Sequence, residues 1–196
     1  MAMMRTFIAI ELDQELQAAL RRLQQHIREQ VAPRSVRWVR PEGVHLTLKF
    51  LGDTPVDKLE EVKAAMTRAA ASLAPFSYTV AGVGCFPNIR RPRVVWAGVQ
   101  EPTGALVTLR DAVEACVAPL GFPTEKRPFR PHLTLGRVQR WASSSEAREI
   151  GEVVAISEVG ASGEFNVTEM AYVQSELRPS GAVYSILHCA ALGVDE

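Results

Sequence analysis

The tetrapeptide His-Leu-Thr-Leu occurs at 45–48 and again at 132–135, and the two copies hold two of the chain's four histidines. Each copy follows a segment that carries proline and arginine, and each precedes a segment with the pattern of a helix. Alternate side chains of a β-strand point to the same face, so the histidine and threonine of each copy would share one face while the leucines pack into a core. The repetition predicts an internal duplication, with two lobes that face each other.

The remaining sequence predicts a mixed order of strands and helices. Alternating or continuous apolar patterns indicate strands at 5–12, 45–52, 75–86, 91–100, 131–138, 163–177 and 181–192. Apolar residues at helical spacing indicate four helices. The first begins after Asp13, and the second begins after Thr54 as its cap, with Pro55 at the first helical position. The third begins near Leu106, and the fourth begins at about 144 after a run of serines. No Gly/Ser linker interrupts the chain, so residues 1–196 are expected to form a single domain.

Composition limits the class of protein. With 47% apolar residues the chain can build a packed core, and its net charge of zero argues against a protein that coats nucleic acid. The start lacks the pattern of a signal peptide, and no segment reaches the roughly 18 apolar residues of a membrane span. Three cysteines without CxxC spacing indicate neither a disulfide framework nor a zinc knuckle. We therefore expect a soluble, cytoplasmic protein that does not contact a membrane.

Although the net charge of the chain is zero, its basic and acidic residues are unevenly distributed along the sequence. The windows 34–49, 84–93 and 125–140 contain twelve basic residues and two acidic ones. Two of these windows include the copies of the repeated tetrapeptide. The pattern predicts a local site for an anion around the repeat.

Two histidines and two threonines that converge between the lobes would suit a tetrahedral phosphate. Threonine hydroxyls can donate to its oxygens, while one imidazole takes a proton from water and the other protonates the leaving oxygen. Two alternatives stay open. Each histidine could bind backbone at the end of a strand, or the pair could hold a metal, although this spacing without a nearby cysteine or an HExxH helix makes a poor metal site.

With these motifs in this order, the sequence resembles the bacterial and archaeal RNA 2′,3′-cyclic phosphodiesterases, also called 2′-5′ RNA ligases, of the 2H phosphoesterase superfamily. The resemblance spans nearly the whole chain. It rests on RTFIAI near the start, HLTLKFLG, GVGCFPNIRRPRVVWAGV, RPFRPHLTLGR, and SELRPSGAVY near the end. No histidine or threonine of the two motifs departs from the family pattern.

The resemblance implies a bilobal α+β fold with two pseudo-symmetric lobes, each an antiparallel sheet with outer helices, around a cleft. It implies hydrolysis of a terminal 2′,3′-cyclic phosphate of RNA to a 2′-phosphate, without metal or cofactor, and a weak, reversible 2′-5′ joining of RNA ends. By their positions in the two motifs, the resemblance implies that His45 is the proton donor and His132 the proton acceptor. Thr47, Thr134 and Arg137 are the phosphate-binding residues.

Eight further residues could contact RNA, and each of them could instead have a purely structural place. Four aromatic residues could stack a base or belong to the core, namely Trp38, Phe50, Phe129 and Tyr184. Four basic residues could grip the RNA backbone or lie in solvent, namely Arg90, Arg91, Arg93 and Arg130.

Strand parity conflicts with the role implied for Arg137. His132, Thr134 and Gly136 share a face in a regular strand, so Arg137 would point into the core with the leucines. A bulge at Gly136 would turn the arginine towards the cleft. The first copy has Lys49 and Phe50 at the matching places, so we predict a bulge on the second strand alone and the lower histidine pKa next to the guanidinium.

The sequence thus favours an RNA 2′,3′-cyclic phosphodiesterase that works as a monomer on RNA ends such as tRNA halves. One alternative is a cyclic phosphodiesterase for a small nucleotide such as ADP-ribose cyclic phosphate. Another is a non-catalytic protein that binds RNA ends.

Overall fold

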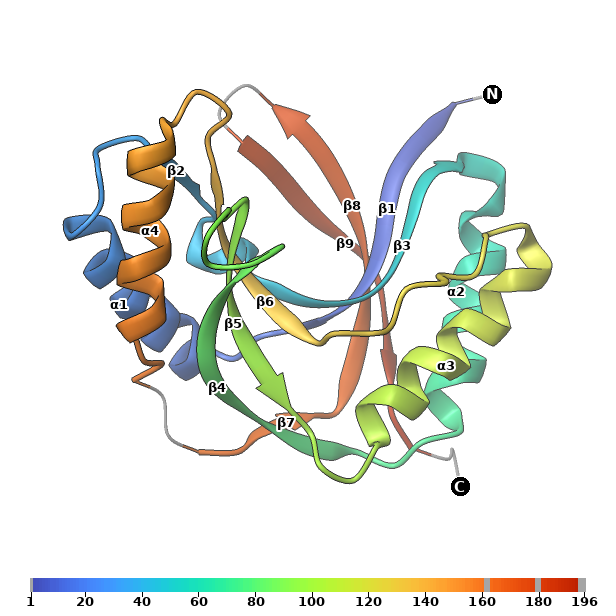
Figure 1. Ribbon diagram of the computed structural model, residues 1–196. Coiled ribbons are helices and arrows are strands. Elements are labelled where there is room, and N and C mark those ends of the chain that lie inside the picture. Colours follow the sequence, from blue (N-terminus) through green and yellow to red (C-terminus); the bar gives the residue numbers. More distant parts are fainter. Residues whose placement is uncertain (1, 161–162, 179–180, 194–196) are drawn as a thin grey trace.

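The computed structural model describes residues 2–160, 163–178 and 181–193. Their strands form one strongly curved sheet, and their helices pack against it (Figure 1). The α-helices are α1 (Gln14–Glu29), α2 (Leu59–Ala71), α3 (Ala105–Val117) and α4 (Ser144–Ile156). The strands are β1 (Met3–Glu11), β2 (Val36–Trp38), β3 (His45–Pro55), β4 (Phe76–Phe86), β5 (Val94–Gln100), β6 (His132–Val138), β7 (Phe165–Val167), β8 (Glu169–Arg178) and β9 (Gly181–Ala191). The predicted elements are present, except that the segment 163–177 forms two strands, β7 and β8, and the short strand β2 was not predicted.

The strands form one sheet in the order β7-β4-β5-β6-β3-β1-β8-β9, with β2 paired to β6. All pairs are antiparallel. The two halves of the sheet meet where β3 lies beside β6, through the single pair Leu46 and Leu133. The α+β architecture with two lobes is confirmed, and the sheets of the two lobes join edge to edge.

The element order is nearly the same on both sides of this junction. Reading outwards, β3, β1 and β8 on one side correspond to β6, β5 and β4 on the other, with β9 and the short β7 at the two edges. Along the chain, β1-α1-β3-α2-β4 corresponds to β5-α3-β6-α4-β8, with β2 and β7 as short additions. Helices α2 and α3 cover one end of the sheet, and α1 and α4 cover the other (Figure 1).

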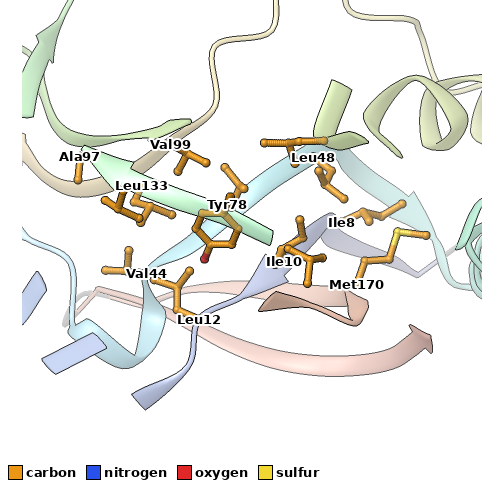
Figure 2. Packing of buried hydrophobic residues seen from close by; sticks show 14 of the residues in the cluster. Ile8, Ile10, Leu12, Val44, Leu48, Tyr78, Ala97, Val99, Leu133 and Met170 are labelled. Carbon is orange, nitrogen blue, oxygen red and sulfur yellow. The ribbon is translucent and has the colours of Figure 1, made fainter. Parts of the chain in front are cut away.

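One hydrophobic core fills the space between the sheet and the helices (Figure 2). Leu46 and Leu133 are completely buried in it, as the alternation in the two motifs predicted. A second, smaller cluster lies apart from that core and consists of Phe7, Ala9, Ala171 and Val173, with Tyr184 packed against it.

The predicted helix caps are confirmed in two cases and wrong in one. Asp13 caps α1 by accepting a hydrogen bond from the Leu16 amide at 2.7 Å, and Ser143 caps α4 in a capping box with Glu146. Thr54 does not cap α2, because β3 continues to Pro55 and the Thr54 hydroxyl forms a buried hydrogen bond of 2.8 Å with Thr6 of β1. Helix α2 begins at Leu59 without a side-chain cap.

None of the helices within the described ranges is both long and apolar enough to cross a membrane.

Candidate active site

The two repeated motifs lie on neighbouring strands and face the same cavity. Because Leu46 and Leu133 pair directly across β3 and β6 and point into the core, the histidines and threonines beside them point to the opposite face. That face lines a cavity of about 490 Å³. The structure therefore brings together His45, Thr47, His132, Thr134 and Arg137.

Both imidazole rings are held in the same way. His45 Nδ1 lies 3.0 Å from the carbonyl oxygen of Gly43, and His132 Nδ1 lies 2.7 Å from that of Arg130. A carbonyl can only accept, so each Nδ1 carries the proton in the neutral ring and donates it. This leaves Nε2 of each histidine as the nitrogen available for proton transfer to or from a ligand.

Aromatic side chains fix the orientation of both rings. Phe7 stacks on His45 with ring centroids 4.4 Å apart, and the ring of Tyr184 lies perpendicular to the same imidazole with centroids 5.1 Å apart. Phe86 meets His132 edge-on at 4.9 Å. These contacts also remove water from the imidazoles, which disfavours their charged form.

The pKa of each histidine lies below its ordinary value. Burial lowers the pKa of His45 to about 4, opposed by the hydrogen bond to Gly43. Burial also lowers the pKa of His132, opposed by the hydrogen bond to Arg130 and assisted by the positive charge of Arg137. The sequence predicted the lower pKa for the histidine next to the guanidinium. That order is wrong, because the larger desolvation of His45 outweighs the effect of the charge.

Strand β6 contains a β-bulge directly after its threonine. The consecutive residues Val95 and Trp96 of β5 pair with Gly136 and Thr134, so Leu135 is an extra residue on β6. Leu135 and Gly136 are both buried, which breaks the alternation of the strand. The predicted irregularity at Gly136 is therefore confirmed.

The bulge returns Arg137 to the face of the two histidines. Its side chain is exposed and lines the cavity, as the role implied by the resemblance requires. Arg37 lies opposite it in the pairing of β2 with β6 and lines the same cavity. Two arginines therefore occupy paired positions on β2 and β6 at this wall.

Strand β3 has a matching bulge, so the prediction of a bulge on the second strand alone is wrong. Thr47 and Lys49 pair with the consecutive residues Ala9 and Ile8 of β1, which leaves Leu48 as the extra residue. The sequence offered no glycine at that place to signal the irregularity.

The asymmetry of the site comes from residue types at equivalent positions. After the bulge of β3, Lys49 is buried and forms an ion pair of 2.7 Å with Glu114 of α3. Phe50 then reaches the cavity, where it is 61% exposed. The first strand thus presents an aromatic ring where the second presents the guanidinium of Arg137.

The bulge of β6 is held by groups from outside the sheet. The carbonyl oxygen of Leu135 accepts hydrogen bonds from the Val39 amide at 2.9 Å and from Gln24 Nε2 at 2.8 Å. The same Gln24 nitrogen donates to the Val39 carbonyl. Helix α1 therefore fastens the bulge to the chain that follows β2.

The other predicted RNA contacts divide into two groups. Trp38, Phe50 and Tyr184 line the cavity. Phe129 does not, because its ring packs against the core with the guanidinium of Arg110 above it at 5.2 Å. Arg90, Arg91, Arg93 and Arg130 also lie outside the cavity lining, with exposed side chains.

Arg5, Phe7, Arg37 and Arg40 also line this site, and none of them was predicted individually, although Arg37 and Arg40 lie in the basic window 34–49. Arg5 and Phe7 alternate along β1 and so share a face, but nothing in the sequence indicated that β1 lies beside the histidine strand. No acidic residue occurs among the described residues that line the cavity. The site is therefore strongly positive, as an anion-binding site requires.

Among the residues that the structure describes, no group of three or more His, Cys, Asp or Glu side chains is arranged to hold an ion.

The chain is similar to characterised proteins over nearly its whole length. An RNA 2′,3′-cyclic phosphodiesterase of Methanothermobacter thermautotrophicus is 35% identical, over 92% of this chain and 95% of that protein. A crystal structure of TT0787 of Thermus thermophilus superposes with a TM-score of 0.81 at 33% identity, covering 96% of this chain and 98% of the other. Escherichia coli LigT, solved in complex with 3′-AMP, superposes with a TM-score of 0.77 at 26% identity, covering 97% and 98% of the two chains.

The family described as LigT-like phosphoesterase matches the chain twice, over residues 10–96 and 98–184. Each match contains one copy of the repeated tetrapeptide. Together the two matches cover most of the chain, and the paired histidine strands described above lie within them. This protein belongs to the LigT-like phosphoesterase family.

Proposed function

We propose that this protein hydrolyses the 2′,3′-cyclic phosphate at the end of an RNA chain to a 2′-phosphomonoester. The observation that carries the proposal is the pair of histidines with identical Nδ1 hydrogen bonds, which leaves two Nε2 atoms at one positive cavity. Relatives at 34% to 35% identity are named RNA 2′,3′-cyclic phosphodiesterases. The same step with the 5′-hydroxyl of a second RNA in place of water would form a 2′-5′ phosphodiester, which is a weak, reversible joining of RNA ends.

The reaction needs one group that accepts a proton and another that donates a proton. His132 Nε2 accepts a proton from water as the water oxygen attacks phosphorus. The bond between phosphorus and the 3′ oxygen breaks, and His45 Nε2 gives that oxygen its proton. The product carries a 2′-phosphate and a 3′-hydroxyl, and proton exchange with solvent restores both imidazoles.

The division of roles is the one that the resemblance implies, and the charges around a bound ligand act differently on the two histidines. A bound phosphate anion raises the pKa of both imidazoles, because the negative charge favours their protonated form. Arg137 opposes that rise at His132, where its charge already lowers the pKa. Arg137 therefore favours the neutral, proton-accepting form of His132, whereas the role of His45 as the acid follows the resemblance and requires the bound phosphate to overcome the effect of burial on its pKa.

Three side chains are suited to hold the phosphate. Thr47 and Thr134 lie on the histidine face of their strands, and their hydroxyls can donate to the two non-bridging oxygens. The guanidinium of Arg137 neutralises the charge that builds up on these oxygens as water attacks. Arg37, which stands beside it, reinforces the positive field.

The aromatic lining is suited to a terminal nucleotide. Phe50 is largely exposed at the cavity, and Trp38 and Tyr184 line other parts of its wall. Aromatic faces stack any base, with a contribution of about 1–3 kcal/mol for each base. This supports an RNA end of any sequence as substrate.

We also propose that the chain arose by internal duplication and acts as a single domain. Support comes from the matching order of elements on the two sides of the β3–β6 junction and from the two successive family matches. In the cell we expect a cytoplasmic monomer that acts on RNA ends such as tRNA halves. Light scattering of the purified protein tests the monomer directly.

The function is tested by end-group analysis. An RNA oligonucleotide ending in a 2′,3′-cyclic phosphate is incubated with the purified protein, and the ends are then separated by phosphatase treatment and chromatography. The proposal predicts conversion to 2′-phosphate ends. A cyclic end that is bound but persists would instead identify a protein that binds RNA ends, and a 3′-phosphate product would contradict the role of His45.

A further inference from the structure

An open groove with a volume of about 1230 Å³ adjoins the histidine cavity. The two share the segment 37–40, which forms a wall of each. The rest of the groove is formed by one face of α1, by the connection from α1 to β2, by Val36, Pro41 and Glu42 beside the shared segment, and by residues 139 and 141 after β6. In Figure 1 these parts lie together at the end of the sheet that α1 and α4 cover.

The groove is lined by five arginines, namely Arg21, Arg28, Arg34, Arg37 and Arg40. Its acidic residues are Glu29 and Glu42, and Glu42 forms an exposed ion pair of 2.6 Å with Arg21. The other four arginines form no ion pair with any residue that the structure describes. Their positive charges are therefore available to an external anion.

Two tryptophans accompany these charges. Trp141 lines the groove with 60% of its surface exposed, and Trp38 lines both the groove and the histidine cavity. An exposed tryptophan beside free guanidinium groups is the combination by which proteins bind single-stranded nucleic acid, through base stacking and contacts to phosphates. The charges and aromatic rings of this groove are not complementary in the same way to an apolar or a cationic partner.

The cavity alone is too small for a polymer. Its volume of about 490 Å³ lies within the range of pockets that hold one small-molecule ligand, roughly 300–1,000 Å³. The remainder of an RNA chain must leave over a wall of that cavity. The wall from β8 and β9 presents uncharged residues such as Ser175, Leu177 and Ala182, whereas the wall 37–40 leads into the arginine groove.

We infer that this groove binds the RNA chain on the 5′ side of the terminal nucleotide, through its phosphates and at least one base. The inference rests on the proposed function and extends it, because it makes a polynucleotide rather than a free cyclic nucleotide the preferred substrate. Arg37 and Arg40 guide the chain out of the cavity, and Arg28 and Arg34 hold the following phosphates.

The test compares two substrates and two double variants. The substrates are a ten-nucleotide RNA with a 2′,3′-cyclic end and a mononucleoside 2′,3′-cyclic phosphate. The groove variant carries Arg28→Gln and Arg34→Gln, which line the groove but not the cavity. The control carries Arg68→Gln and Arg148→Gln, which remove the same charge from exposed positions that line neither.

We expect kcat/KM of the groove variant to fall about tenfold on the oligonucleotide and to stay unchanged on the mononucleotide, with the control at wild-type values on both. The slope of log kcat/KM against log salt on the oligonucleotide should also become shallower by about 1.4, since each lost phosphate contact on a single strand removes about 0.7. An equal loss on both substrates, or none on the oligonucleotide, would overturn the inference.

Binding separates this inference from the proposed function. Fluorescence anisotropy measures the affinity of each variant for a ten-nucleotide RNA with a 2′-phosphate end, without any turnover. Weaker binding by the groove variant alone supports the groove even where the wild type hydrolyses neither substrate, a result that would contradict only the proposed function. Wild-type affinity in the groove variant contradicts the groove itself.

Discussion

Phe50 of β3 and Arg137 of β6 occupy equivalent positions, each three residues after the threonine of its motif, and both reach the same cavity. Each is placed there by a bulge at the residue after the threonine. The duplicated framework therefore supplies one aromatic wall and one cationic wall. The aromatic wall can stack a base of a ligand, and the cationic wall can neutralise the phosphate of the same ligand.

Replacing Arg137 should damage the chemical step more than binding. Arg137→Ala is expected to lower kcat/KM for a cyclic-ended oligonucleotide by about 10²-fold or more, mostly in kcat, since the guanidinium acts on charge that develops during attack. Arg137→Lys keeps a point charge and should recover part of the loss. Steady-state kinetics measures both variants, and an unchanged kcat in Arg137→Ala would remove this residue from the mechanism.

The pH dependence of kcat/KM follows from the two histidines of the free protein. The base must be neutral and the acid protonated, and burial lowers the pKa of His45 to about 4 and also lowers that of His132. The rate should therefore be bell-shaped, with its maximum below the ordinary histidine pKa of about 6.5, and should fall as the pH rises towards 8. A maximum at pH 8 or above would contradict the assignment.

The threonine hydroxyls should affect kinetics without affecting stability. Neither Thr47 nor Thr134 forms a side-chain hydrogen bond to another described residue, so replacement by valine leaves no protein group unpaired. Thr47→Val and Thr134→Val are each expected to lower kcat/KM about 10-fold or more at an unchanged melting temperature. Thr54→Val is the matched control, because its hydroxyl is buried against Thr6 and its loss should lower the melting temperature but not kcat/KM.

Gly136 should not tolerate a side chain. A β-carbon there would lie 2.6 Å from Val36 Cγ1 and 3.0 Å from Trp38 Cε3, so β2 would have to move. Gly136→Ala is expected to cost about 1–3 kcal/mol in the free energy of unfolding and to displace Arg37 from its place beside Arg137. Denaturant unfolding measures the cost, and Gly160→Ala, which has open space around it, should be close to neutral.

Local patterns predicted most elements of this fold because they depend on neighbours in sequence. Asp13 and the serine run marked helix starts correctly, and the alternation of Leu46 and Leu133 marked the core face. Thr54 carried the same signal as a helix cap but lies in a strand, because a distant partner, Thr6, satisfies its hydroxyl. Such a partner is invisible in a local pattern.

The site was predictable where the chain repeats itself and unpredictable where strands far apart in sequence meet. The repeated tetrapeptide identified both histidines, and a parity conflict at Arg137 identified the bulge of β6. The bulge at Leu48 gave no such conflict, since both Lys49 and Phe50 can lie on either face of a strand. The contributions of Arg5 and Phe7 depend on the pairing of β1 with β3, which only the structure supplies.

The central claim is that two histidines, without a metal, open the cyclic phosphate by attack of water on phosphorus. It is tested most directly by the rate at which 2′-phosphate ends appear in ¹⁸O-labelled water with excess chelator, for the wild type, His45→Ala and His132→Ala. The account predicts full wild-type activity, one ¹⁸O atom in the product phosphate, and a loss of about 10²-fold or more in each variant. Activity that vanishes with chelator and returns with a divalent ion, or near-normal turnover in either histidine variant, would contradict it.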